Sequence, residues 1–226
     1  MSADLEIRVQ PIVPGNPPVA IIEDFAEDPS ALRKQAIMSP FRPAREHYPG
    51  LRAELPRQYW VTQQPIISRI LKRVYGLAGA VELIDASFSM VTSTPAELSI
   101  LQRIPHCDAF SNRQFALIHY LSPDFSNGTA FFRHRSTGLQ TLNEGQRDRF
   151  FDCLEAEFEE HGTPPADYIF GDSPLFEQVL AIDARFNRAI IYPGNALHSG
   201  VIPPGARLST DPADGRLTIT AFFTVG

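Results

Sequence analysis

The sequence predicts a mainly β protein, a jelly roll (double-stranded β-helix) with N-terminal helices and one inserted helix. Three observations support this fold class. Two helical patterns come first, and the one at 57–75 is clearly amphipathic. After Gly76 the chain breaks into about seven or eight short runs rich in β-branched and aromatic residues, with turn residues between them. One acidic helical pattern, at 142–161, interrupts these runs. Many short strands separated by turns are typical of sandwiches and barrels.

The first 80 residues are expected to form two strands and then two helices. Residues 6–13 and 19–22 are the strand patterns, and Asp28 with Pro29 marks the start of a helix that continues over 31–38. The helix at 57–75 follows from apolar residues at helical spacing. Between the helices, residues 39–56 are rich in proline and are expected to be irregular, as a functional or flexible loop.

The rest of the chain is expected to be a β core with a helical insertion. The inserted helix has Asn143 as its N-cap and an apolar stripe that includes Phe150 and Phe158. We expect one domain over 1–226, with 1–80 as helical support and 81–226 as the β core. The strand patterns lie at 81–92, 96–102, 115–121, 129–133, 176–182, 188–192, about 198–202 and 217–225.

Composition excludes several classes of protein. The 226 residues carry a net charge of −6 and give a pI near 5.5, so no basic surface for nucleic acid is expected. Two cysteines are too few for a disulfide framework, and neither has the spacing of a zinc motif. The first residues are acidic rather than basic, unlike a secretory signal, and no apolar stretch is long enough to span a bilayer. A cytoplasmic protein without a membrane partner is expected; oligomeric state stays open.

Three residues suggest a metal site. His106 and Asp108 are two positions apart, so in an extended segment both side chains point to the same face and Cys107 points away. His198 follows a later strand pattern and would add a second imidazole. Two histidines and one carboxylate with open positions are diagnostic of non-heme Fe(II) oxygenases. The alternative is that these are ordinary loop, capping and turn residues.

An anion-binding group is expected on the last strand. Arg216, Thr218 and Thr220 alternate with apolar residues and share one face, and a guanidinium binds a carboxylate bidentately. Tyr120 could add a hydroxyl donor. The alternatives are a polar outer face for Arg216 and core packing for Tyr120. Further arginines could bind an acidic substrate or be solvated at the surface, and His134, in a basic run, could touch substrate but is expected at the surface. These arginines are Arg45, Arg52, Arg133 and Arg135.

Several short motifs, in order along most of the chain, resemble those of the iron(II)/2-oxoglutarate-dependent oxygenases. Within these, the chain is most similar to the prolyl-hydroxylase-like branch and its uncharacterised bacterial relatives. Each motif is short, so the likeness depends on the series. The motifs are Pro105-His106-Cys107-Asp108, Tyr120-Leu121-Ser122, residues 127–131, residues 187–193 followed by His198, and Gly215-Arg216-Leu217-Thr218.

The resemblance implies an Fe(II) centre held by His106, Asp108 and His198, with O2 and 2-oxoglutarate as co-substrates. Arg216 would hold the distal carboxylate of 2-oxoglutarate, although the family often places this arginine nearer the position of Arg207. An intact Asp108 argues against the halogenating variants, and no catalytic residue beyond the metal ligands is expected. Helpers around the co-substrate would be Tyr120, Thr218 and Thr220.

The activity that the resemblance implies is hydroxylation of an amino acid, a peptide or a small metabolite. Such a substrate would lie under the loop at 39–56 and the helix around 150–158, since loops on a rigid scaffold commonly carry specificity. Two other readings stay open: a non-catalytic jelly-roll module that binds a ligand, and a cupin-like metalloenzyme, such as a lyase, that does not use 2-oxoglutarate.

Overall fold

A computed structural model describes residues 6–44, 48–123 and 128–226, so Arg45 and the first residue of the motif at 127–131 lie outside the described residues. The described strands pair in antiparallel fashion in two sheets. The strands are β1 (Ile7–Pro11), β2 (Pro18–Ile22), β3 (Arg42–Pro43), β4 (Gly50–Glu54), β5 (Val81–Val91), β6 (Gln114–Tyr120), β7 (Thr129–His134), β8 (Phe176–Ile182), β9 (Ala189–Pro193), β10 (His198–Gly200) and β11 (Leu217–Val225).

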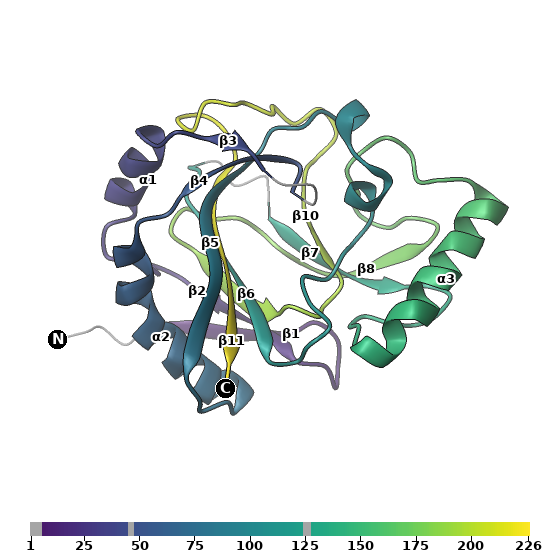
Figure 1. Cartoon of the computed structure of the whole chain (residues 1–226), viewed down its shortest axis with the longest axis horizontal. Helices are drawn as coiled ribbons and strands as arrows, with labels where there is room; N and C mark the ends of the chain where they lie inside the picture. Colours follow the sequence, from purple (N-terminus) through teal and green to yellow (C-terminus); the bar gives the residue numbers. More distant parts are fainter. Residues whose placement is uncertain (1–5, 45–47, 124–127) are drawn as a thin grey trace.

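The larger sheet has eight strands in the order β1-β2-β9-β6-β11-β5-β4-β3, and the smaller has three in the order β10-β7-β8. Figure 1 shows the two sheets on either side of the molecule's centre. In the described part of the chain, β1 with β2, β3 with β4, β4 with β5, and β7 with β8 are neighbours in a sheet, and the other strands that follow one another in sequence are not.

Three α-helices flank the sheets: α1 (Pro29–Ile37), α2 (Arg57–Tyr75) and α3 (Glu144–His161). All three match the sequence prediction to within a few residues. Asp28 accepts a hydrogen bond from the Ala31 amide as the N-cap of α1, and α2 ends at Gly76, which has the left-handed φ of 69°. In Figure 1, α1 and α2 lie beside the larger sheet, and α3 lies on the opposite side of the molecule, next to β7 and β8.

The alternation of residues along β11 separates two apolar clusters. Leu217 and Ile219 are fully buried on the face that α2 covers, where they pack with Ile67 and Ile70 of that helix. Thr218 and Thr220 point to the opposite face, which packs against the smaller sheet. This polar pair within an otherwise apolar interior marks the side of the sheet where a site can be built.

The expected strand at 96–102 is wrong. This segment forms two short 3₁₀ turns, Pro95–Glu97 and Ile100–Arg103. Each turn begins with a capping box, in which the side chain of Glu97 or Gln102 returns to the amide of Thr94 or Ser99. Local bonds from side chains to the backbone therefore determine this segment rather than its strand-like pattern.

The segment 39–56, expected to be irregular, contains β3 and β4. Strand β4 pairs with β5 over five residues, and at Gly50 a Cβ would overlap the carbonyl oxygen of Met90. A glycine is required at that close approach. Four of the eight strands of the larger sheet thus come from the first 80 residues, which were expected to give mainly helical support. No helix in the described part of the chain is both long and apolar enough to cross a membrane.

Candidate metal centre

Main-chain bonds bring the two histidines together. The His106 amide donates to the His198 carbonyl (2.9 Å), and the His198 amide donates to the His106 carbonyl (2.8 Å). This single bridge attaches the loop at 104–110 to the start of β10. The Asp108 amide donates to the carbonyl of Gly194 (2.7 Å), in the turn before His198. The backbone therefore holds all three residues at one place between the sheets.

The three side chains converge as the spacing predicts. The Nε2 atom of His106 lies 3.7 Å from Oδ1 of Asp108, and Nε2 of His198 lies 3.5 Å from Oδ2. One ligand atom from each of the three residues lies within 4.8 Å of the other two. The His106 side chain is 52% exposed, whereas those of Asp108 and His198 are 13% and 6% exposed. The group is thus buried on one side and open on the side of His106.

The imidazole ring of His198 has an orientation that is compatible with metal binding. Its Nδ1 donates to the carbonyl of Ala196 (2.9 Å), which leaves the lone pair of Nε2 directed toward Asp108. Burial lowers the pKa of His198 from 6.5 to about 4, so the imidazole is neutral at pH 7. The rings of Tyr192 and Phe131 pack around it, with centroids 4.8 and 6.2 Å away.

Asp108 is a buried carboxylate, and one of its two oxygens lacks a hydrogen-bond partner among the described residues. Burial raises its pKa from 3.8 to about 6, although His106 and Arg52 act in the opposite direction. Its Oδ2 atom is buried and accepts no hydrogen bond from any described residue. A carboxylate oxygen in this position, between two imidazoles, has the chemistry of a site for a divalent cation. The donor set fits iron of the facial-triad type.

Arg216 lies in a second polar region on the same side of the sheet. Its Nη2 donates to the carbonyl of Gly128 (2.9 Å), and its Nε is buried without a partner among the described residues. Burial raises the pKa of Tyr48 and of Tyr120, and the nearby Arg216 guanidinium acts in the opposite direction on both. A guanidinium with an unused donor among hydroxyls has the composition of a carboxylate site.

The other residues expected near the co-substrate lie in this region. The Tyr120 hydroxyl bonds with the Thr129 hydroxyl (2.8 Å), and Tyr120 is 1% exposed. Thr218 and Thr220 are 1% and 8% exposed, and the Thr220 hydroxyl bonds with Ser89 (2.8 Å). Arg207, the alternative anchor, is instead 80% exposed and pairs with Asp214 at 2.6 Å.

Of the further arginines, Arg52 is the one whose charge acts on Asp108. Its guanidinium stands over the Tyr48 ring at 4.7 Å and lowers the pKa of Asp108. Arg133 pairs with Glu177 at 2.5 Å, and Arg135 pairs with Asp172 at 3.0 Å, so both are engaged in surface ion pairs. Phe150, on the helix expected to cover a substrate, is buried in an apolar cluster beneath α3.

Two residues of the region were absent from the sequence prediction. Tyr48 precedes β4, and Tyr168, whose hydroxyl donates to the Ser93 carbonyl (2.8 Å), follows α3. The Arg216 guanidinium affects the pKa of both. The only sequence signal was the combination Tyr48-Pro49-Gly50, which is typical of a turn and carries no sign of a pocket.

Comparisons with known proteins agree with the architecture. A family model described as a family of unknown function (DUF6445) matches residues 3–223. No curated protein matches the chain. Among solved structures, the chain is similar to the non-heme α-ketoglutarate-dependent carbocyclase SnoK from nogalamycin biosynthesis, with 11% identity, a TM-score of 0.50, and coverage of 92% of this chain and 79% of that one.

Two further structures are similar. The epimerase SnoN, in complex with Fe³⁺, α-ketoglutarate and nogalamycin RO, has 12% identity, a TM-score of 0.50, and coverage of 92% of this chain and 78% of that one. HygX from Streptomyces hygroscopicus, with nickel, 2-oxoglutarate and hygromycin B bound, has 10% identity, a TM-score of 0.49, and coverage of 92% and 82%. At such identities, the likeness to SnoK and SnoN shows a shared fold.

Proposed function

Because this chain belongs to the DUF6445 family, whose function is unknown, we propose its activity from its own site: an Fe(II)- and 2-oxoglutarate-dependent oxygenase. The reaction proposed is hydroxylation of an amino acid, a peptide or a small metabolite. The motif series favours the prolyl-hydroxylase-like branch, and the fold shared with SnoK and SnoN is compatible with an enzyme of this general kind.

One observation carries the proposal. His106, Asp108 and His198 offer three ligand atoms within 4.8 Å, and the buried Asp108 oxygen has no hydrogen-bond partner among the described residues. An uncompensated buried carboxylate destabilises a fold unless a cation or a proton neutralises it. We therefore assign the three residues as the ligands of Fe(II).

Arg216 is the proposed anchor of 2-oxoglutarate. Its guanidinium would bind the distal carboxylate, and its buried Nε is the donor left for that bond. Tyr120, Thr218 and Thr220 would bind and orient the same end of the molecule from strands β6 and β11. Arg207 is too exposed for this role.

The protein's part in the reaction follows from these contacts. Iron(II), with 2-oxoglutarate and O2, supplies the oxidising power for hydroxylating a C–H bond. Tyr192 and Phe131 exclude water from the buried side, and the Ala196 carbonyl keeps His198 in the tautomer that binds metal. The exposed side at His106 is where the small-molecule or peptide substrate would enter, with Arg52 at its edge.

An anaerobic titration tests the proposal. Fe(II) protein should develop a metal-to-ligand charge-transfer band when 2-oxoglutarate is added. His106→Ala should abolish binding of Fe(II), and Arg216→Ala should weaken binding of 2-oxoglutarate at least tenfold, as loss of a bidentate ion pair predicts. The matched control is Arg207→Ala, which should bind 2-oxoglutarate like the parent.

The other outcomes separate the remaining readings. Metal binding without the charge-transfer band would indicate a cupin-like metalloenzyme. Absence of metal binding would indicate a ligand-binding module. If Arg207→Ala were the weaker binder, the anchor would be misassigned. If the charge-transfer band is observed, release of succinate in a screen of amino acids, peptides and small metabolites would identify the substrate class.

A further inference from the structure

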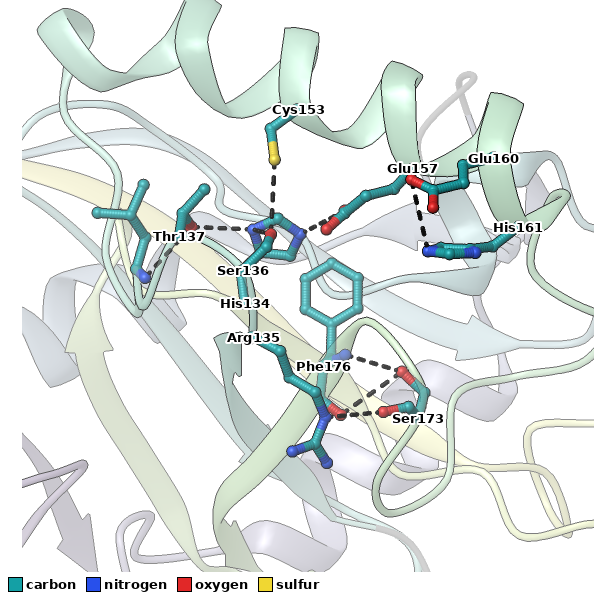
Figure 2. Close-up of polar contacts among 11 residues, drawn as sticks. His134, Arg135, Ser136, Thr137, Cys153, Glu157, Glu160, His161, Ser173 and Phe176 are labelled. Carbon is teal, nitrogen blue, oxygen red and sulfur yellow. Dashed lines mark hydrogen bonds and ion pairs between the residues drawn. The ribbon is translucent and has the colours of Figure 1, made fainter.

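A second group of metal-binding side chains lies between β7 and α3, away from His106, Asp108 and His198. His134 is the last residue of β7, and Cys153 and Glu157 stand four residues apart on α3, so they share one face of that helix. One ligand atom from each residue lies within 4.8 Å of the other two. Figure 2 shows both helical side chains directed at the His134 ring.

His134 is the fixed member of the group. It was expected at the surface, but its side chain is 0% exposed and lies between the rings of Phe150 and Phe176, each with its centroid 5.1 Å away. The turn that follows β7 contains Gly138, with a φ of 70°, and brings Thr137 under the ring. The Thr137 hydroxyl bonds with Nδ1 at 2.9 Å, which sets the orientation of the imidazole.

The other ring nitrogen faces the carboxylate of Glu157, and a cation bound by both would take the place of the proton between them. Nε2 of His134 lies 2.8 Å from Oε2 of Glu157, whose side chain is 14% exposed. The Sγ of Cys153 contacts the Ser136 hydroxyl at 3.5 Å, and Cys153 is half-buried and forms no disulfide. Because Glu157 and Thr137 occupy both ring nitrogens, the thiol lacks the imidazole bond of a Cys–His nucleophile pair.

We propose that His134, Cys153 and Glu157 form a second metal site, which takes a divalent cation of the zinc class. Imidazole nitrogen, thiolate sulfur and carboxylate oxygen are the three ligand types of Zn²⁺, and thiolate excludes the oxygen-seeking Mg²⁺ and Ca²⁺. One thiolate and one carboxylate balance the charge of a divalent ion. The Thr137 hydroxyl acts as the outer partner that holds the imidazole in place, as in other histidine metal sites.

The position of the group indicates what the ion would do. It links the buried end of β7 to the middle of α3, and α3 otherwise attaches through an apolar cluster that contains Phe150, Leu154 and Leu197. Figure 2 also places Glu160 and His161 farther along α3, where they face each other at 3.9 Å outside the group. The ion is therefore a structural clip between helix and sheet, and its binding releases the thiol proton.

Cobalt spectroscopy tests the assignment on the full-length chain. Co²⁺ added to metal-free protein should give a thiolate-to-cobalt charge-transfer band with one equivalent of ion. The group of His106, Asp108 and His198 contains no thiol, so it gives no such band. Cys153→Ser should abolish the band, and Cys107→Ser, the matched control at the only other cysteine, should retain it. A parent without the band, or a band that survives Cys153→Ser, overturns the proposal.

A second measurement does not depend on the cysteine variant. Glu157→Gln keeps the shape of the side chain, so it should fold as the parent does and bind Zn²⁺ at least tenfold more weakly. Zn²⁺ should also raise the melting temperature of Asp108→Ala protein, in which the first group is disabled, but not that of Asp108→Ala/Cys153→Ser protein. If Glu157→Gln and the parent bound Zn²⁺ with equal affinity, no ion would bind at this place. The same conclusion would follow if Zn²⁺ raised the melting temperatures of Asp108→Ala and Asp108→Ala/Cys153→Ser by equal amounts.

Discussion

At the scale of single residues, the burial of Asp108 lowers the stability of the metal-free protein at neutral pH. In the metal-free protein, its raised pKa means that the folded state keeps a proton more strongly than the unfolded chain does. Protonated Asp108 contributes fully to the stability of the folded state below pH 4, and this contribution is lost as the pH rises through about 6. The difference between 3.8 and about 6 corresponds to about 3 kcal/mol at pH 7.

Asp108→Asn should therefore stabilise the metal-free protein at pH 7, by about 1–3 kcal/mol, because the amide carries no charge and can donate to Nε2 of His198. Chemical denaturation of both proteins between pH 4 and pH 8 measures the effect. The gain should vanish near pH 4, and the same variant should lose Fe(II) binding. A constant difference across this range would mean that Asp108 does not titrate there.

His119 should make the protein sensitive to acid. Burial lowers its pKa from 6.5 to about 4, and its ring bonds with Tyr59 (3.1 Å) and Asn187 (3.0 Å). The contribution to stability is full above pH 6.5 and is lost as the pH falls toward 4, by about 3 kcal/mol at most. His119→Gln should be less stable than the parent at pH 7, and the gap should narrow as the pH falls. If the difference in stability between His119→Gln and the parent were independent of pH, titration of His119 would not cause the acid sensitivity. His198 and Asp108 titrate equally in both proteins, so they do not contribute to that difference.

At the scale of elements, helix α2 should be held by packing rather than by its own propensity. Ile70 is 0% exposed against the larger sheet, whereas Val61, on the same helix, is 54% exposed. Ile70→Ala should cost about 2–5 kcal/mol of unfolding free energy, and Val61→Ala less than about 0.5 kcal/mol. Urea denaturation distinguishes the two. Similar losses for both variants would contradict the packing of α2 seen here.

Elements with a strong local pattern could be predicted from the sequence, and those decided by distant partners could not. The helices at 57–75 and 142–161 and the last strand have clear periodicity, and the sequence also marks the C-terminal Gly76 of the first helix and the N-cap Asn143 of the second. Strand β4 has neither, because it exists through its pairing with β5. The segment 96–102 has a β-type composition, but two capping boxes turn it into 3₁₀ structure.

In the candidate site too, features set by the local sequence could be predicted, and features set by distant partners could not. The side chains of His106 and Asp108 lie close together, and their spacing of two residues is visible in the sequence. The place of Tyr48 beside Arg216 depends on β4, and the burial of His134 depends on α3 folding back over β7. The sequence held no zinc spacing, because only Cys153 and Glu157 are near one another along the chain.

At the scale of the whole molecule, the N-terminal 80 residues and the β core should fold as one unit. Residues 6–80 supply β1 and β2 at one edge of the larger sheet and β3 and β4 at the other, and α2 covers its apolar face. A fragment of residues 77–226 should therefore lack a cooperative unfolding transition and should aggregate. Circular dichroism during thermal unfolding checks this. A cooperative transition in the fragment would show two separable domains.

The bridge between His106 and His198 also bears on when the protein could acquire the proposed metal ion. The first two ligands are synthesised long before the third, and the strand that carries His198 is held by β7 and by the loop of His106. A growing chain on the ribosome that has not yet reached His198 has only two of the three proposed ligands. An ion bound by all three side chains therefore enters late in biogenesis, after β10 has docked, and its retention reports that the chain has completed its topology.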